Sequence, residues 1–553
     1  MSSVAALRPN QNGTVQRSSG AWSAIGHWRP GGSAPAFDRA GITRMVHRVR
    51  EPIRVVADGN GNVGTAIGGE ITHGGEQAQY LCLGALPALY PEWLGDRSFA
   101  QQHGTRYPYV AGEMARGIAT TRLVTAMAHG GMLGFFGAAG LGLGPVEQAV
   151  TELSAELGAT GSWGVNLIHT PDEPQLEDRL VALLLRHGVR RVSTSAFMEL
   201  TPAVVRCAAA GLRRDTAGQI VRRTRVFAKV SRPEVAERFM SPPPAQLLRV
   251  LVERGELTAA EAELASRIPI AEDITVEADS GGHTDNRPLT ALLPAVLGLR
   301  DELSRRFGYP SRIRVGAAGG LGSPQGVAAA FALGAAYVVT GSVNQASLEA
   351  GISDTAKALL AQADLADVAM APSSDMFELG VKVQVLRRGT VFAARAGQLY
   401  EIYRDYPGLE AVPAQVRGRL EREVLHAGLD EIWAETRQYW QARDPAQLTR
   451  AQRDPKHRMA LVFRWYLGSS SRWAIRGDAA RRTDYQLWCG PAMGAFNRWV
   501  AGSFLAEPAN RSAVQIARNL LAGAAVVTRA HQLRTYAVPV PAEAFEFKPR
   551  QLS

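Results

Sequence analysis

Two glycine-rich stretches, each at the end of an apolar run, contain the residue types that hold a phosphate group. The first covers residues 316–322, and the second is Gly341-Ser342 after the apolar run 337–340. Glycines let the backbone approach a phosphate closely, and the N–H groups of such turns supply positive potential. Either stretch alone could equally be a tight turn without a ligand. Together they favour a phosphate site formed by Gly319, Gly320, Gly341 and Ser342.

A histidine directly after two glycines, in Gly281-Gly282-His283, is the candidate for proton transfer. It follows the apolar run 274–278, and imidazole exchanges protons near neutral pH. The alternative is a histidine that contacts the cofactor or the protein and moves no proton. A metal site is a weak interpretation, because no second His or Cys lies at ligand spacing.

The elements that must position these residues form a regular alternation of apolar runs and helical stretches. This βα spacing begins near residue 107, and eight strand-like runs can be counted up to residue 340. Eight strands close a (β/α)8 TIM barrel. The runs cover residues 107–114, 132–137, 163–168, 189–193, 225–230, 274–278, 313–317 and 337–340.

The strand count gives the glycine-rich stretches a place in the barrel. In a TIM barrel the loops after strands seven and eight form the usual phosphate site, at the end where catalysis occurs. Both stretches follow those two strands, and His283 follows strand six at the same end. This combination predicts a flavin mononucleotide (FMN) enzyme, with the phosphate held by backbone and a histidine beside the ring.

Residues at other predicted strand ends could receive the flat ring. Gly112 and Met114 end the first strand, and Asn166 lies inside the third. A buried amide needs a hydrogen-bond partner, which a pyrimidine edge could supply; a capped turn is the alternative. Lys229 lies within the apolar fifth strand, where an inward lysine is costly unless it is paired. It contacts flavin or phosphate, or else points outward into solvent.

The whole chain predicts an α/β protein with additions on both sides of the barrel. Residues 1–35 are rich in Gly, Ser and Pro and predict a flexible arm, whereas residues 36–105 predict a small β element. The FMN-binding barrel covers 106–374 with a helical insert at 241–271. Residues 375–508 predict a helical lid or substrate domain, and 509–553 a C-terminal helix packed back on the barrel, with a tail.

Composition favours a soluble cytoplasmic protein. Apolar residues make up 46% and charged residues 20%, and the three cysteines include no CxxC pair. No apolar run reaches membrane-spanning length, and the N-terminus lacks a signal-peptide pattern. Lys and Arg exceed Asp and Glu by 61 − 51 = 10. Such an excess can indicate nucleic acid, a membrane surface or an acidic protein partner, and nucleic acid is disfavoured because no nucleic-acid motif accompanies the arginines.

Longer motifs extend the pattern beyond the glycine turns. They include Ser195-Ala196-Phe197-Met198 and the Asp-Met-Phe-Glu-Leu-Gly stretch at 375–380. With segments 164–169, 277–286, 316–322 and 340–345, they resemble the PfaD family of trans-acting enoyl reductases, which belongs with the nitronate monooxygenase-like barrels. The Gly-Gly-His and Gly-Gly-Leu-Gly pieces alone indicate only that wider group. One departure is Glu113, where a small residue is expected.

The resemblance implies a ping-pong reduction with FMN and NADPH as cofactors. The hydride passes from NADPH to FMN and then to the β-carbon of an α,β-unsaturated thioester on an acyl carrier protein. His283 or water supplies the proton at the α-carbon. Carrier proteins are usually acidic, which gives the positive excess a use. Our cofactor-binding residues are Gly112, Met114, Asn166, Lys229, Gly281, Gly282, Gly319, Gly320, Gly341 and Ser342.

Two other functions stay open from the sequence. One is a nitronate monooxygenase-type oxidase, which has the same FMN barrel and uses O₂ as acceptor. The other is a non-catalytic barrel that serves as a scaffold inside a synthase. The acyl chain and the cognate carrier protein are also open, as is a homodimer, while neither nucleic acid nor a membrane is expected as a partner.

Overall fold

The structure is a computed structural model, and it describes residues 24–73, 79–158, 160–171 and 173–553. Its contacts divide the chain into two compact units. One combines residues 1–93 with 521–548, and the other comprises residues 94–520 and 549–553. Residues 1–23, the larger part of the predicted arm, lie outside the described residues. The second unit holds the barrel and all the candidate site residues.

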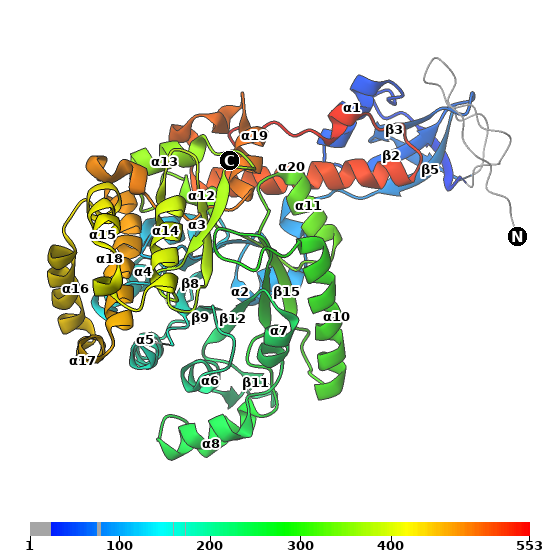
Figure 1. Cartoon of the computed structure of the whole chain (residues 1–553). Coiled ribbons are helices and arrows are strands. Elements are labelled where there is room, and N and C mark those ends of the chain that lie inside the picture. The colour runs from blue at the N-terminus through cyan, green and yellow to red at the C-terminus, as the bar shows by residue number, and fades with distance from the viewer. Residues whose placement is uncertain (1–23, 74–78, 159, 172) are drawn as a thin grey trace, which may run out of the picture. The chain divides into compact units, whose positions relative to one another are not determined.

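Eight parallel strands of the second unit close into a barrel, which confirms the predicted fold class (Figure 1). The barrel closes where β16 pairs with β6, in a register that places Val338 opposite Tyr109. Apolar and β-branched residues dominate the strands, as expected for strands buried on both faces. The strands are β6 (Tyr109–Ala111), β7 (Leu133–Phe136), β8 (Trp163–Ile168), β9 (Arg191–Ser195), β12 (Arg225–Val230), β13 (Asp273–Glu277), β15 (Arg314–Ala318) and β16 (Val338–Thr340).

Helices alternate with these strands and surround the barrel (Figure 1). The sequence marks several of their starts, because Thr120, Thr201 and Ser323 each accept a hydrogen bond from a first-turn amide. The segment predicted as a helical insert contains α8 (Ala245–Glu253) and α9 (Ala259–Ala265). The other helices are α2 (Arg97–His103), α3 (Thr121–His129), α4 (Leu143–Leu157), α5 (Pro174–Arg186), α6 (Pro202–Ala209), α7 (Pro233–Met240), α10 (Leu289–Phe307) and α11 (Pro324–Ala332).

Buried charged side chains fill the amino-terminal end of the barrel. Arg314, at the start of β15, donates two hydrogen bonds to Asp273, at the start of β13, over 2.6 and 2.8 Å. His103 of α2 places Nε2 3.1 Å from the same carboxylate, and its Nδ1 accepts from Arg191 over 3.2 Å. This network closes one end of the barrel, so a ligand must enter at the other end, where the strands finish.

Besides the barrel strands, the chain has a small sheet and a layer of helices. The elements after residue 375 fall in the region predicted as a lid, and those before it fall in the region predicted as barrel. The antiparallel sheet has the order β14-β18-β17 and includes β14 (Gly282–His283), β17 (Val368–Pro372) and β18 (Lys382–Leu386). Because β14 follows barrel strand β13, this sheet ties the lid to the barrel mouth. The helices are α12 (Ser342–Gln345), α13 (Asp354–Ala361), α14 (Phe392–Asp405), α15 (Ala414–Leu420), α16 (Leu429–Arg443), α17 (Pro445–Arg453), α18 (Pro455–Arg476) and α19 (Ala492–Val500).

The other unit is built on a five-stranded antiparallel sheet, in the region predicted as a β element. Its order is β3-β2-β5-β1-β4, and helix α1 (Arg39–His47) belongs to the same unit. Strand β1 forms inside the segment that we expected to be flexible. The strands are β1 (Gly26–Arg29), β2 (Ile53–Ala57), β3 (Val63–Ile67), β4 (Glu70–Thr72) and β5 (Tyr80–Leu86).

The last long helix, α20 (Ala513–Thr535), was expected to pack on the barrel, which stays a prediction; its residues 513–520 group with the barrel unit. Residues 521–548 group with residues 1–93. Arg529, which is 1% exposed, donates a hydrogen bond to the carbonyl of Pro87 over 2.5 Å. A buried guanidinium needs such acceptors, and the sequence gives no sign of where they lie.

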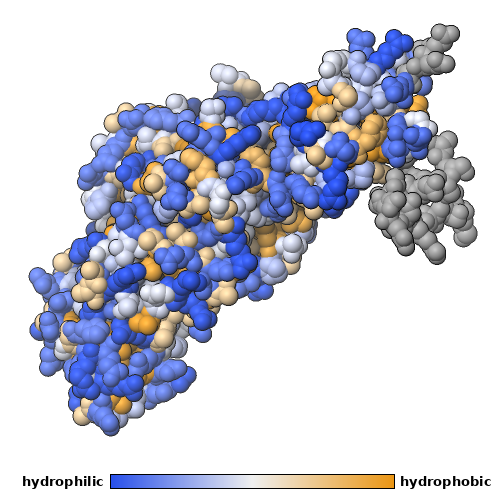
Figure 2. Space-filling model, turned by 90° about the horizontal axis from the view of Figure 1, so that it is seen from above, coloured by the Kyte–Doolittle hydropathy of each residue, from blue (hydrophilic) through white to orange (hydrophobic). Residues whose placement is uncertain are grey.

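No helix among the described residues combines the length and the apolar character needed to cross a membrane. Figure 2 shows a mostly hydrophilic face with small apolar patches. The most exposed large apolar side chain among the described residues is Leu379, at 75%, in the loop before β18. Apolar residues otherwise fill the barrel and a lid core that includes Phe377, Phe392 and Phe463.

Candidate active site

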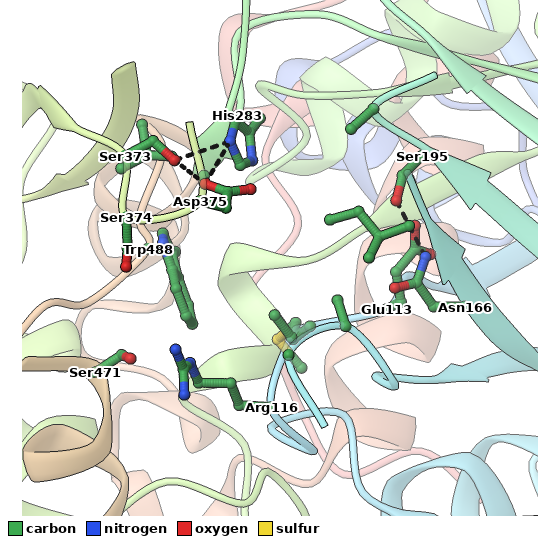
Figure 3. Close-up of a pocket in the computed structure, with 18 of the residues that line it drawn as sticks. Glu113, Arg116, Asn166, Ser195, His283, Ser373, Ser374, Asp375, Ser471 and Trp488 are labelled. Atoms are coloured by element: carbon green, nitrogen blue, oxygen red, sulfur yellow. Dashed lines mark hydrogen bonds and ion pairs between the residues drawn. The ribbon is translucent and has the colours of Figure 1, made fainter. Parts of the chain in front are cut away.

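The carboxyl-terminal ends of the barrel strands open into a cavity of about 500 Å³ (Figure 3). Strand-end loops line one part of it, and lid residues such as Ser373, Asp375 and Trp488 line another. All the residues predicted from the sequence as catalytic or cofactor-binding line this one cavity, and their roles stay predictions. They are Gly112, Met114, Asn166, Lys229, Gly281, Gly282, His283, Gly319, Gly320, Gly341 and Ser342.

Gly320 and Gly341 form an open wall of the cavity beyond β15 and β16. A Cβ atom built on either glycine meets no atom within 4 Å. Gly320 also has φ +72°, a conformation that side chains disfavour. Within the described residues, the amides of both glycines donate to no protein acceptor. Open space beside available N–H groups fits the phosphate end of FMN.

Two of the other predicted glycines are explained by close packing. Gly319 has φ +87°, and a Cβ there would lie 2.7 Å from backbone at the end of β13. A Cβ on Gly281 would lie 2.8 Å from the amide nitrogen of Cys489. The next amide, of Gly490, donates to Ser342 Oγ over 3.1 Å. Gly281 and Gly319 therefore shape the cavity without having to touch a ligand.

Lys229 lies between two carboxylates at the barrel mouth. Its Nζ is 3.2 Å from Glu113 Oε1 and 3.2 Å from Glu277 Oε1. Burial lowers the pKa of Lys229, but the two carboxylates outweigh this effect and raise the pKa well above its usual range. Burial raises the pKa of Glu277 despite the attraction of Lys229. The lysine is thus a fixed positive charge inside the cavity, and the solvent-facing alternative does not hold.

His283 belongs to a polar cluster that joins the barrel to the lid (Figure 3). Strand β14 places it opposite Val383 of β18. Its Nε2 lies 3.2 Å from Ser373 Oγ and 3.4 Å from Asp375 Oδ1, and the serine hydroxyl donates to the same carboxylate. Burial lowers the pKa of His283, but Asp375 outweighs it and the net pKa is raised. The imidazolium form is therefore favoured at a position that lines the cavity.

Asn166 uses its amide within the barrel wall. The residue is 1% exposed, and its Nδ2 donates to the carbonyl of Ser193 and to Ser195 Oγ, each over 3.1 Å (Figure 3). Both amide hydrogens are taken, so the side-chain oxygen is what remains for a ring. Ala196, the residue directly after Ser195, has φ +63° and also lines the cavity. A non-glycine residue keeps such a conformation only where its surroundings enforce it.

Several cavity residues escaped prediction because they come from segments far apart in the chain. Asp375 lies in one of the motifs that carry the family resemblance, but the resemblance implies no role for this residue. Glu113 was noticed only as a departure from that family. Arg116 and Arg472 carried no sequence signal that placed them together; both line the cavity, one after β6 and the other on α18.

Two family models match the chain. Residues 97–392, more than half of it, match the model described as nitronate monooxygenase. Residues 406–485 match the inserted helical domain of acyl-carrier-protein S-malonyltransferase. The first match covers the barrel and β14, β17 and β18, and the second covers helices α15 to α18.

One solved structure is similar over most of the chain. It is the enoyl reductase domain of MlnA, from the macrolactin biosynthesis cluster of Bacillus amyloliquefaciens, with a TM-score of 0.77 and 38% identity. The match covers 80% of this chain and 99% of that one.

Two curated relatives are longer proteins. One of the polyunsaturated fatty acid synthase subunits of Thraustochytrium sp. is 47% identical over 448 residues, 80% of this chain and 30% of that protein. Polyketide biosynthesis protein PksE of Bacillus subtilis is 41% identical over 489 residues, 88% of this chain and 62% of that protein. The chain therefore spans less than two thirds of either relative. With its barrel, its site and these similarities in view, the chain belongs to the nitronate monooxygenase family and, within it, to the PfaD-like enoyl reductases.

Proposed function

We propose that this chain is an FMN-dependent enoyl reductase that uses NADPH and acts in trans on α,β-unsaturated thioesters of an acyl carrier protein. The observation that carries the proposal is a single cavity lined by the open wall of Gly320 and Gly341 and by the His283–Asp375 pair. The relatives support the setting, because their names refer to polyunsaturated fatty acid synthase, to polyketide biosynthesis and to an enoyl reductase domain.

The residues present fit FMN. The amides at Gly320 and Gly341 would hold its phosphate, while Gly112, Met114 and Lys229 line the space for the ring. When bound, FMN accepts a hydride from NADPH and passes it to the substrate. Lys229 contributes a fixed positive charge, which stabilises negative charge that develops in the cavity during reduction.

Reduction of the double bond adds a hydride at the β-carbon and a proton at the α-carbon. We propose His283 as the proton donor, because its Nε2 is held by Ser373 and Asp375 and no described residue bonds its Nδ1. An imidazolium oriented in this way acts as a general acid through Nδ1. Asp375 is a positioning residue, since it acts through His283.

We propose the helical region as the place where the carrier protein binds. Residues 406–485 match a helical domain whose name includes an acyl carrier protein. Arg450, Arg453, Arg476 and Arg482 of this region are exposed. Arg481 is different, because it is largely buried against the Trp473 ring at 4.3 Å and pairs with Asp484. It therefore belongs to the core of the lid and is excluded from the docking surface.

The test follows the flavin spectrum of purified protein under anaerobic conditions. NADPH should bleach the flavin, and a crotonyl thioester should restore its colour in a single turnover. If O₂ restores the colour and the thioester does not, the oxidase alternative replaces the proposal. A protein that stays colourless with added FMN would support the scaffold alternative instead.

A further inference from the structure

Arg116 lies at the edge of the cavity in an enforced conformation. It follows β6 with φ +58°, in the left-handed region that side chains disfavour. Its side chain passes Gly140, whose Cβ position is 3.3 Å from Arg116 Cγ. Its Nη2 lies 3.8 Å from the Cβ position of Gly468 on α18. Glycines at both places leave room for the extended guanidinium, which Figure 3 shows beside Trp488 and Ser471.

Arg472 lies one helical turn after Gly468, on the same face of α18. It also lines the cavity, and its Nη2 donates to Ser469 Oγ over 2.8 Å. Ser374 Oγ lies 3.6 Å from the Cβ position of Gly468, near Arg116. Two guanidinium groups and a serine hydroxyl thus gather around one stretch of the lid helix.

Neither arginine has a carboxylate within ion-pair distance among the residues that the structure describes. Two other arginines of the same cavity wall do: Arg443 pairs with Glu173 at 3.0 Å, and Arg464 with Glu378 at 3.3 Å. Burial lowers the pKa of Arg116, and the charge of Arg472 lowers it further, while the more distant Asp375 carboxylate offsets only part of this effect. Two partly buried like charges oppose folding unless an anion accompanies them.

We infer that Arg116 and Arg472 form a subsite for a phosphate group of the second ligand that enters the cavity. The identity of that ligand rests on the proposed function, which offers two sources of phosphate: NADPH and the phosphopantetheine arm of a carrier protein. The FMN phosphate is a poorer fit, because its expected cradle at Gly320 and Gly341 lies beyond β15 and β16 and adjoins the 490–492 segment. The arginine subsite is formed by α18 and the loop after β6.

The experiment measures binding to the FMN-loaded protein by titration calorimetry with inorganic pyrophosphate, NADP⁺ and pantetheine 4′-phosphate. Arg116→Gln and Arg472→Gln should each weaken at least one of these probes by about tenfold or more, the size expected for a lost charge-assisted hydrogen bond. The matched control is Arg305→Gln, which removes the same charge from an exposed position on α10, outside the cavity, and should leave binding unchanged. Flavin content and melting temperature check that each variant folds.

NADP⁺ and pantetheine 4′-phosphate distinguish the two sources of the phosphate. NAD⁺, which lacks the 2′-phosphate, is the reference for NADP⁺, and pantetheine, which lacks the 4′-phosphate, is the reference for pantetheine 4′-phosphate. If pyrophosphate, NADP⁺ and pantetheine 4′-phosphate all bind the arginine variants as tightly as the wild type, the subsite is wrong and the proposed function stands. If only pyrophosphate binds and depends on the two arginines, the subsite stands and the proposed ligands fail. Loss of FMN from the Arg116 and Arg472 variants, or equal weakening by Arg305→Gln, would overturn the subsite, as would wild-type protein that binds none of the probes.

Discussion

At the scale of single residues, His283 is the side chain whose removal should affect chemistry more than cofactor binding. His283→Ala should keep FMN, because the proposed phosphate contacts come from Gly320 and Gly341. It should slow reoxidation of the reduced protein by a crotonyl thioester about 10²-fold, the usual contribution of a general acid. Stopped-flow absorbance measures this step. An unchanged rate would leave His283 a structural residue.

The Asp375 carboxylate should set the pH range in which His283 works. It raises the pKa of the imidazole against the effect of burial. The proton donor is therefore present below this raised pKa, and the rate should fall as pH rises through it. Asp375→Asn removes the charge, so the inflection in the rate–pH profile should move to lower pH. A profile that keeps its inflection would show that another group titrates.

Gly320 should be needed for FMN because its missing side chain leaves the space that a phosphate fills. Gly320→Leu should purify without flavin, measured by absorbance after release of the cofactor. Gly255→Leu is the matched control, since Gly255 has φ +67° and also meets nothing within 4 Å, but lies in the insert outside the cavity. It adds a similar backbone strain and should keep its FMN. Full flavin content in Gly320→Leu would reject the phosphate assignment.

Residue-scale prediction worked where a side chain's position follows from its own strand. Lys229, Gly320 and His283 end or follow barrel strands, so counting strands placed them at one mouth. Sequence could not show that Asp375 meets His283, because that contact depends on how β14 pairs with β18. Nor could it show that both amide hydrogens of Asn166 form hydrogen bonds to the neighbouring strand β9.

At the scale of elements, the buried network at the amino end of β13 and β15 should govern stability. Asp273→Asn leaves Arg314 buried with a neutral partner and should cost about 3–5 kcal/mol of unfolding free energy. Urea denaturation at neutral pH measures it. Asp301→Asn is the control, because its pair with Arg300 involves a half-exposed carboxylate and should cost under about 1 kcal/mol. Equal losses in the two variants would show that the network contributes no more than a surface pair.

The same network should make the protein less stable as the pH falls. Burial raises the pKa of Asp273, but His103 and Arg314 outweigh it, and the net pKa lies well below its usual range. A depressed carboxyl pKa stabilises the fold above the unfolded-state pKa, and this contribution is lost as pH falls. Asp273→Asn should therefore show a weaker decline in stability between about pH 5 and pH 3 than the wild type.

The barrel strands were predictable because most are apolar runs at regular spacing, and several are followed by a helix with its own start signal. The β14-β18-β17 sheet was missed because β14 has two residues and includes a glycine, too short for a periodic pattern. Residues 521–548, which begin within the last helix, group with residues 1–93, and the sequence does not indicate this grouping. Its Ala- and Leu-rich sequence shows that it is buried, but periodicity does not say against what.

At the scale of the whole molecule, the positive excess should assist docking of an acidic carrier protein. Charge reversal at Arg453 and Arg482, both exposed, should raise the KM for a carrier-bound substrate and leave that for a free thioester mimic unchanged. High salt should narrow the difference between variant and wild type, because it screens exposed charges.

The control for this docking prediction changes the net charge equally at another place. Arg249→Glu/Arg254→Glu alters two exposed arginines in or next to α8, outside the lid, and should leave both KM values as in the wild type. If both double variants act alike, total charge matters and the helical region is not the docking site.

Because Gly281 packs against the backbone of Cys489, the rate at which the Cys489 thiol is alkylated should report opening of this contact. Burial raises the pKa of the Cys489 thiol to about 12, so the thiol reacts with an alkylating agent only when the 489–490 segment lifts away from the barrel mouth. FMN should slow its labelling, followed by mass spectrometry, because a filled cavity favours the closed state. Cys207, equally buried on α6 outside the cavity, is the internal reference, and its labelling should not respond. Equal labelling of Cys489 with and without FMN would mean that the segment opens independently of the cavity. If FMN slows the labelling of Cys489, the labelling rate reports how often this segment opens beside the cavity.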